Sequence, residues 1–262
     1  MEYDGSGFCG WQVQGQGERT VQGEFEKILA KVFKQDISSI ASGRTDSGVH
    51  AAGQVVSFKA KTRMAPVQIQ KALNASLPPD IAVLETRSVG ANFHAQYSAK
   101  RKTYRYTVLN RDHRSAFWRD RAYFYPHQLD LAAMRRAVKF LVGKHDFRSF
   151  QAHDPLRCER DTVRTVKALT VIREGDFIHI EVTANGFLYK MVRNMVGTLL
   201  AVGCGHMKPA QVRTLLKAKN RQAAPKTAPA RGLCLMSVKY LNNLTFAQDM
   251  LYFQFTLKSL TG

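Results

Sequence analysis

A short polar loop between two apolar stretches carries the residue types best suited to chemistry. It covers residues 43–51 and reads GRTDSGVHA. Its two glycines allow tight turns that can aim side chains into a cavity. Asp46 is a candidate nucleophile or base, and Arg44 is a candidate positioning charge. Two plainer interpretations stay open: an Asx-type turn at Asp46 with Arg44 in solvent, and a packed, non-catalytic His50.

The second signal is a cation inside an apolar helix. Residues 188–202 are strongly apolar, and Arg193 stands within them. A buried guanidinium is costly unless it meets a carboxylate. Arg193 therefore needs an acidic partner, and Asp46 is one option. An ion pair with a purely structural role is the other interpretation.

Cations alternate with aromatic residues over residues 97–106, which read YSAKRKTYRY. Basic side chains bind phosphates, and an aromatic ring can stack on an unstacked nucleobase. On a strand, Tyr104 and Tyr106 share one face and Arg105 points to the other. Packing of both tyrosines in the core is the alternative. The candidate substrate-binding residues are Tyr104, Lys100, Arg101, Lys102 and Arg105.

The charge of the chain points to a polyanionic partner. Of 262 residues, 39 are Lys or Arg and 20 are Asp or Glu, which gives a net charge of +19. Residues 1–96 hold 10 basic and 9 acidic side chains, whereas residues 97–262 hold 29 and 11. Such an imbalance favours nucleic acid or an anionic membrane surface as the partner. A basic face without a specific partner is the plainer interpretation.

Several classes of protein are disfavoured. No apolar run approaches the length of a membrane span, and no leader for export precedes a cleavage site. The cysteines form no C-x-x-C pair, so we expect free thiols in the cytoplasm and no metal site; they are Cys9, Cys158, Cys204 and Cys234. Residues 5–10 match G-x-G-x-x-G, but without the required strand before them and helix after them, so we expect a surface turn instead.

The patterning predicts an α+β fold. Strand, helix and paired strands recur on both sides of residue 105, which suggests two similar halves, residues 1–104 and 105–262, around a central, mostly antiparallel sheet with a cleft between them. The helices are expected at residues 21–35, 66–74, 130–142, 188–202 and 209–219. The strands are expected at residues 37–42, 54–60, 81–89, 103–109, 163–172, 177–183, 235–240 and 251–257.

Taken together, these motifs resemble the bacterial tRNA pseudouridine synthase A family. The resemblance runs in family order from residue 3 to about residue 240. Where family members usually carry several strand residues before the Tyr3-Asp4-Gly5 segment, this sequence has Met1 and Glu2, so the first strand is expected to be short. The matching pieces are Tyr3–Gln12, Gly43–Ala51, Lys102–Tyr106, Gly143–Phe147, Gly186–Gly197 and Ala228–Leu233.

The resemblance implies a fold, a reaction and a set of roles. Asp46 would be the catalytic aspartate, Tyr104 the ring that stacks on the target base, and Arg193 the partner of the aspartate, with Arg44 beside it in the loop. The family isomerises uridine to pseudouridine in the anticodon stem-loop of tRNA, around positions 38 to 40. It acts as a homodimer on tRNA, without a cofactor. The basic C-terminal half would then bind tRNA.

Two other functions compete with this one. A non-catalytic RNA-binding protein or RNA chaperone would keep the fold, but the presence of Asp46, Tyr104 and Arg193 together favours the enzyme. A metal-dependent nuclease built on Asp46 and His50 lacks the clustered carboxylates that a two-metal site needs.

Overall fold

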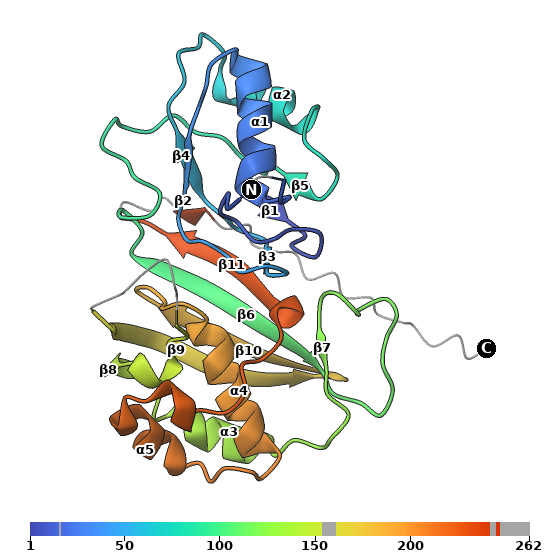
Figure 1. The fold of residues 1–262 in the computed structure, drawn as a ribbon, viewed down its shortest axis with the longest axis vertical. Coiled ribbons are helices and arrows are strands. Elements are labelled where there is room, and N and C mark those ends of the chain that lie inside the picture. Colours follow the sequence, from blue (N-terminus) through green and yellow to red (C-terminus); the bar gives the residue numbers. More distant parts are fainter. Residues whose placement is uncertain (16, 154–160, 242–244, 247–262) are drawn as a thin grey trace, which may run out of the picture.

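One long sheet extends through the computed structural model, from one end of the molecule toward the other (Figure 1). The structure describes residues 1–15, 17–153, 161–241 and 245–246. The expected strand at residues 251–257 lies outside them. In that described part, no helix is long and apolar enough to cross a membrane.

The described residues form twelve strands and five α-helices, with three single 3₁₀ turns at Arg148–Phe150, Arg221–Ala223 and Ala230–Gly232. The helices are α1 (Val21–Phe33), α2 (Pro66–Asn74), α3 (Leu131–Val138), α4 (Met191–Gly203) and α5 (Gln211–Ala218). The strands are β1 (Glu2–Tyr3), β2 (Ser39–Ala41), β3 (His50–Ala51), β4 (Val56–Phe58), β5 (Ile81–Ala82), β6 (Arg101–Leu109), β7 (Tyr123–Phe124), β8 (Gly143–Asp146), β9 (Val163–Glu174), β10 (Phe177–Ala184), β11 (Leu233–Lys239) and β12 (Thr245–Phe246).

The sheet brings together segments that are far apart in the sequence. Its strand order is β5-β1-β3-β11-β6-β10-β9-β8, with β12 on β11 and β7 on β6. Neighbouring strands are antiparallel except β3 with β11 and β6 with β7, so the sheet is mostly antiparallel as predicted. Because β11 lies between β3 and β6, the loop before β3 comes close to the middle of β6. The expected boundary after residue 104 falls within β6.

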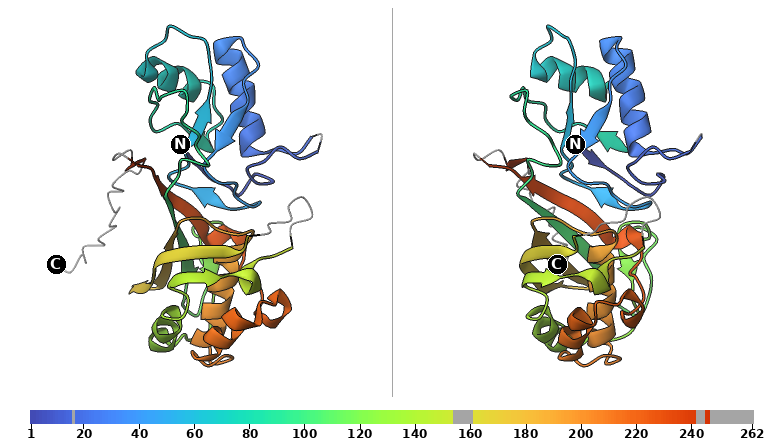
Figure 2. Two further views of the ribbon diagram at one scale, coloured as in Figure 1. Left: turned by 90° about the vertical axis from the view of Figure 1, so that its left-hand side faces the viewer. Right: turned by 60° about the vertical axis from the view of Figure 1, so that its left-hand side comes forward.

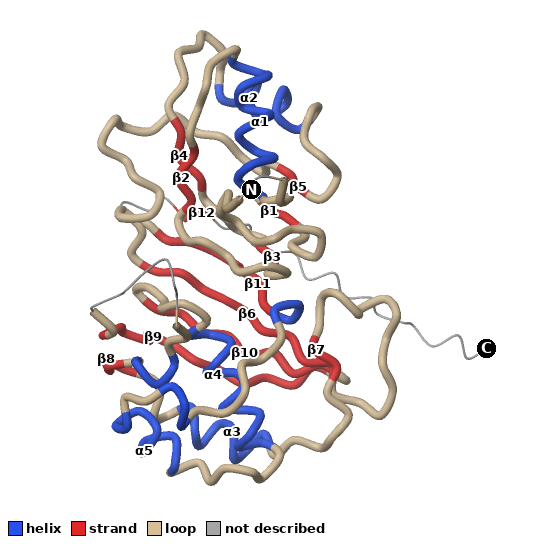
Figure 3. Tube along the Cα trace, viewed as in Figure 1, coloured by secondary structure: helices blue, strands red, loops and turns tan. Residues whose placement is uncertain are grey.

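The helices gather in two groups. Figure 3 shows α1 with α2 at one end of the molecule and α3 with α4 and α5 at the other, and the two views of Figure 2 agree. In α1, the apolar spacing buries Phe25, Leu29 and Phe33, and the Thr20 hydroxyl caps the helix by accepting the Gly23 N–H at 3.2 Å. Threonine is one of the residue types favoured at the N-cap position. Helix α4 is buried on almost every side, as its apolar sequence indicates.

Several predicted elements differ from the observed ones. The prediction of α2 is confirmed at both ends. The strands expected at residues 163–172 and 177–183 are also confirmed as a pair, β9 and β10, which are joined by a turn at residues 175–176. The strand expected at residues 81–89 is wrong beyond Ala82, because only residues 81 and 82 pair with β1. Helix α4 begins at Met191, later than predicted, because Lys190 adopts a left-handed conformation with φ of 56°.

Helix α4 passes very close to the chain that follows α5. A β-carbon at Gly197 would lie 2.0 Å from the backbone oxygen of Lys226. Only glycine permits this approach, which brings the next residues, up to Ala228, against the first turns of α4. The Ala228 N–H donates to the Arg193 carbonyl at 3.1 Å.

We therefore predict that Gly197→Ala lowers the free energy of unfolding by about 2 kcal/mol, because the added methyl group overpacks a backbone contact. Urea denaturation measures this change. Gly90→Ala is the matched control, since a β-carbon there meets nothing within 4 Å, and its effect should stay below about 0.5 kcal/mol. Equal stability of the two variants would contradict the close approach.

Candidate active site

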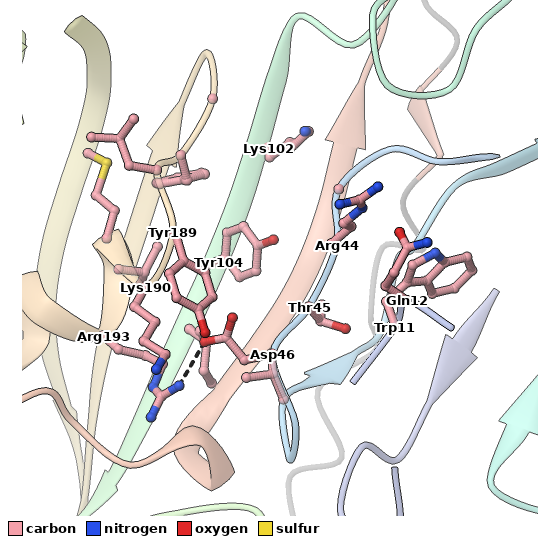
Figure 4. Close-up of a pocket in the computed structure, with 18 of the residues that line it drawn as sticks. Trp11, Gln12, Arg44, Thr45, Asp46, Lys102, Tyr104, Tyr189, Lys190 and Arg193 are labelled. Carbon is pink, nitrogen blue, oxygen red and sulfur yellow. Dashed lines mark hydrogen bonds and ion pairs between the residues drawn. The ribbon is translucent and has the colours of Figure 1, made fainter. Parts of the chain in front are cut away.

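A cavity of about 580 Å³ opens beside the middle of β6 (Figure 4). Four stretches of chain supply most of its wall: residues 9–14, 43–49, 96–104 and 186–193. Its volume falls in the range of small-molecule and cofactor sites. The side chains that line it include Trp11, Gln12, Arg44, Asp46, Tyr97, Lys102, Tyr104, Arg164, Phe187, Tyr189, Lys190 and Arg193.

An ion pair between Asp46 and Arg193 lies in this cavity. Arg193 Nη1 donates to Asp46 Oδ2 at 2.7 Å, and the two side chains are only 15 % and 19 % exposed, Arg193 and Asp46 respectively. Arg193 Nε also donates to the Ala228 carbonyl at 2.8 Å, which fixes the plane of the guanidinium. The prediction that Arg193 needs a carboxylate, with Asp46 as an option, is confirmed. Arg193 lies in the first turn of α4. The Asp46 carboxylate therefore lies near the N-terminus of this helix, where the helix dipole favours negative charge.

The loop that carries Asp46 is held by the segment before α1. The Tyr3 hydroxyl hydrogen-bonds the Thr45 hydroxyl at 2.8 Å, and the Trp11 N–H donates to the Thr45 carbonyl at 3.0 Å. Gly10 has φ of 97°, and a β-carbon there would lie 2.9 Å from the Thr45 carbonyl oxygen. Two glycines of the G-x-G-x-x-G match, Gly5 and Gly10, therefore let this segment pack closely against the Asp46 loop. The prediction of a surface turn at residues 5–10 is only partly correct, because part of this turn is buried.

The carboxylate of Asp46 is aimed into the cavity. Among the described residues, its hydrogen bond is with Arg193, and the turn at this point is closed by the backbone, from the Val49 N–H to the Asp46 carbonyl at 3.1 Å. The alternative of a local Asx turn is therefore not what the structure shows. Arg44, from the same loop, also lines the cavity.

His50 is a packed histidine, in line with the plainer interpretation. It is 8 % exposed, and its Nδ1 accepts the Gly5 N–H at 3.1 Å. Nδ1 also lies 3.3 Å from Asp4 Oδ1, and Nε2 lies 2.8 Å from the Asp120 carbonyl oxygen. His50 is not among the residues that line the cavity, so these contacts order the surrounding chain.

The two tyrosines of β6 have different surroundings. The Tyr104 ring lines the cavity and packs edge-to-face against Phe187, with ring centroids 5.1 Å apart. Burial raises the pKa of Tyr104, with smaller contributions from Tyr3 and Asp46, so its phenol stays neutral. Tyr106 is wholly buried and donates its hydroxyl to the Pro229 carbonyl at 2.9 Å. The core interpretation is therefore correct for Tyr106, whereas Tyr104 is buried at the cavity wall.

The structure separates the basic residues that the sequence grouped together. Lys102 lines the cavity with Tyr104. Arg105 points away from them, as strand alternation requires, and its Nε donates to Glu181 at 2.7 Å. Lys100 and Arg101 are exposed and do not line the cavity. Their role as substrate-binding residues stays a prediction.

Some cavity residues were not singled out from the sequence. Arg164 lies on β9 and reaches the cavity only because of the register of the β9–β10 hairpin, which leaves no local signal. Tyr189 and Lys190 directly precede α4, the helix that carries Arg193. In the described part of the chain, no group of three or more His, Cys, Asp or Glu side chains is placed to hold a metal ion.

Comparison with known proteins identifies the family of the chain. A family profile described as "tRNA pseudouridine synthase" matches residues 1–98 and 137–241. The chain therefore belongs to the tRNA pseudouridine synthase family. It is 46% identical to the tRNA pseudouridine synthase A of Moorella thermoacetica over 242 residues, which is 92% of this chain and 97% of the relative.

Two further relatives carry the same name. The protein of Bacillus pumilus is 46% identical over 244 residues, with 92% of this chain and 98% of the relative covered. That of Halalkalibacterium halodurans is 47% identical over 235 residues, covering 89% of this chain and 88% of the relative. The resemblance stated from the motifs is confirmed over most of the chain.

We predict that Arg193→Ala lowers the free energy of unfolding by about 3 kcal/mol, because it leaves the Asp46 carboxylate in a largely buried place without its partner. Chemical denaturation measures the change. Lys27→Ala is the control: it removes an exposed pair with Glu24, which should cost less than about 1 kcal/mol. If Arg193→Ala were no more destabilising than Lys27→Ala, the ion pair would not be stabilising the fold.

Proposed function

We propose that this protein isomerises uridine to pseudouridine in the anticodon stem-loop of tRNA, around positions 38 to 40, with Asp46 as the nucleophile. The single observation that carries the proposal is the Asp46 carboxylate, aimed into a cavity and held by Arg193 at 2.7 Å beside the Tyr104 ring. Membership of the family supports the reaction. The same three residues in one cavity favour an enzyme over an RNA chaperone.

The reaction needs few groups. The bond from ribose C1′ to N1 of the base breaks, a bond from C1′ to C5 forms, and the C5 proton is lost while N1 gains one. Atoms and electrons balance without a redox partner. An ionised carboxylate can attack C1′, attack C6 of the base or remove a ribose proton, and Asp46 is placed for this role. The cation of Arg193 stabilises the negative charge that each of these reactions requires.

The base must leave its stack to reach such a cavity. Tyr104 supports the flipped uracil by stacking and keeps it close while it detaches and rotates. Phe187 packs edge-to-face on the Tyr104 ring, which fixes the orientation of that ring. Arg44, from the same loop as Asp46, adds a positioning charge at the cavity wall.

The partner is a polyanion, which suits a chain of net charge +19. We propose that two similar halves, residues 1–104 and 105–262, flank the cavity and that the basic second half binds tRNA. Lys100, Arg101 and Arg105 would contact the RNA outside the cavity. By resemblance to its family, the protein acts in the cytoplasm as a homodimer, without a cofactor.

We predict that Asp46→Asn abolishes pseudouridine formation and leaves tRNA binding intact, because the amide keeps the size of the side chain but cannot act as an anionic nucleophile. Unmodified tRNA is incubated with each protein, and pseudouridine is mapped by carbodiimide-dependent primer extension. New stops at positions 38 to 40 with the wild-type protein support the proposal. Turnover by Asp46→Asn, or stops only elsewhere, would contradict it.

We predict that Tyr104→Leu lowers kcat/KM roughly 5- to 150-fold, which corresponds to the loss of about 1–3 kcal/mol of base stacking. Tyr106→Phe is the control, because it keeps a ring on the same strand face but in the core. It should leave kcat/KM within about twofold and act on stability through the lost hydrogen bond to Pro229. Equal kcat/KM for Tyr104→Leu and the wild type would remove Tyr104 as the stacking residue.

A further inference from the structure

An exposed aromatic ring lies at the outer edge of the cavity. Tyr97 is among the residues that line the cavity, yet it is 77 % exposed. Tyr104, the ring that would stack on the flipped uracil, is only 7 % exposed. The two rings therefore belong to different depths of one site, Tyr104 at its buried wall and Tyr97 where it opens to solvent. The reaction described above uses Tyr104 and gives Tyr97 no role.

The turn that carries Tyr97 is closed by its own hydrogen bonds. The Ser98 N–H donates to the His94 carbonyl at 2.9 Å, and the His94 N–H donates to the Ser98 hydroxyl at 3.2 Å. His94 Nδ1 accepts the N–H groups of Gln96 and Tyr97, each at 3.2 Å. These bonds fix both the backbone of the turn and the orientation of the imidazole ring.

The same turn is anchored to the interior of the protein. Ala95, at its centre, is wholly buried, and its carbonyl accepts the Tyr240 hydroxyl at 2.7 Å. The Ala95 N–H donates to the Ser57 hydroxyl at 3.2 Å. An exposed ring on an anchored turn is preorganised, so a ligand that binds it orders little of the chain.

One face of the Tyr97 ring is free to accept a flat ligand. The other face stacks on His94, with ring centroids 4.3 Å apart and the planes inclined by 28°. A ring with one face covered can be 77 % exposed only if the opposite face is open. Stacking on such an open aromatic face is how proteins bind unpaired nucleobases.

The charges around Tyr97 suit RNA. Lys100 and Arg101 follow it in the sequence, and both are exposed. Residues 86–111 contain no Asp or Glu, so no carboxylate of this stretch opposes a phosphate. Basic side chains that attract the phosphates, next to a ring that stacks on the bases, are the combination by which proteins bind single-stranded nucleic acid.

We propose that Tyr97, stacked on His94, is a second base-binding site, which holds a nucleobase of the RNA adjoining the flipped uridine and outside the cavity. That the adjoining nucleotide is the target uridine rests on the proposed function, whereas the base at Tyr97 rests on the open ring and its cations. Because both rings line one cavity, the two bases belong to neighbouring nucleotides. Every nucleobase has a π-face, so the site accepts any of the four.

The first test measures binding of a fluorescent, unmodified tRNA by anisotropy, with each variant made in the Asp46→Asn protein so that no turnover occurs. Tyr97→Leu should weaken binding at least about 5-fold, which is the lower end of the effect of losing one stacked base. Tyr97→Phe is the matched control, because it keeps the ring, and it should bind within about twofold of the parent. Since Tyr97 is exposed, both variants should keep the urea midpoint of the parent.

A second test identifies the ligand as a base. Two RNAs each lack one base, on the 5′ or the 3′ side of the target uridine. At least one of them should bind more weakly than the intact RNA to the proteins with Tyr97 or Tyr97→Phe, and this loss should be at least about 5-fold smaller for Tyr97→Leu. Comparing the losses between proteins cancels any effect of the missing base on the fold of the RNA.

Two results would overturn this site. One is tRNA binding by Tyr97→Leu that equals the parent, and a changed sedimentation coefficient of that variant would then show that the ring contacts a second copy of the chain. The other is an equal loss with and without the ring for both abasic RNAs. Absence of pseudouridine formation by the wild-type protein would instead overturn the proposed function, because the Tyr97 site is judged from binding alone.

Discussion

The contact between Asp46 and Arg193 is the constraint on which the rest of the site depends. It joins the loop before β3 to the first turn of α4, across 147 positions of the sequence. Both groups are largely buried, so each is costly without the other. The second hydrogen bond of Arg193, to Ala228, ties a third segment to the same point. A single pair therefore fixes where the Asp46 carboxylate lies.

The arrangement of the backbone brings the two members of this pair together. Because β11 lies between β3 and β6, the Asp46 loop is carried to the face of β6 that bears Lys102 and Tyr104. The close approach at Gly197 keeps the chain near Ala228 against α4. Gly10 and Trp11 hold the loop from its other side through Thr45. Close backbone contacts at glycines therefore help to assemble the cavity, together with the ion pair.

Much of the site could be predicted from residue types alone. An arginine in an apolar helix needs an acidic partner. The polar loop between two apolar stretches contains Asp46, which was one option for that partner. Local signals also placed both ends of α2. Strand alternation alone predicted that Arg105 points away from Tyr104. What could not be predicted depends on register: Arg164 reaches the cavity through the β9–β10 hairpin. The strand β8 has the sequence GKHD, whose composition gives no sign of a strand.

The measurement that tests this account most directly is a double-mutant cycle on the stability of the protein, with Asp46→Asn, Arg193→Ala and the double variant. If the two side chains stabilise one another as the structure indicates, the cycle gives a coupling free energy of about 2 kcal/mol, and the double variant is less destabilised than the sum of the singles. A coupling below about 0.5 kcal/mol would contradict the account, since the effects of independent sites add within that limit.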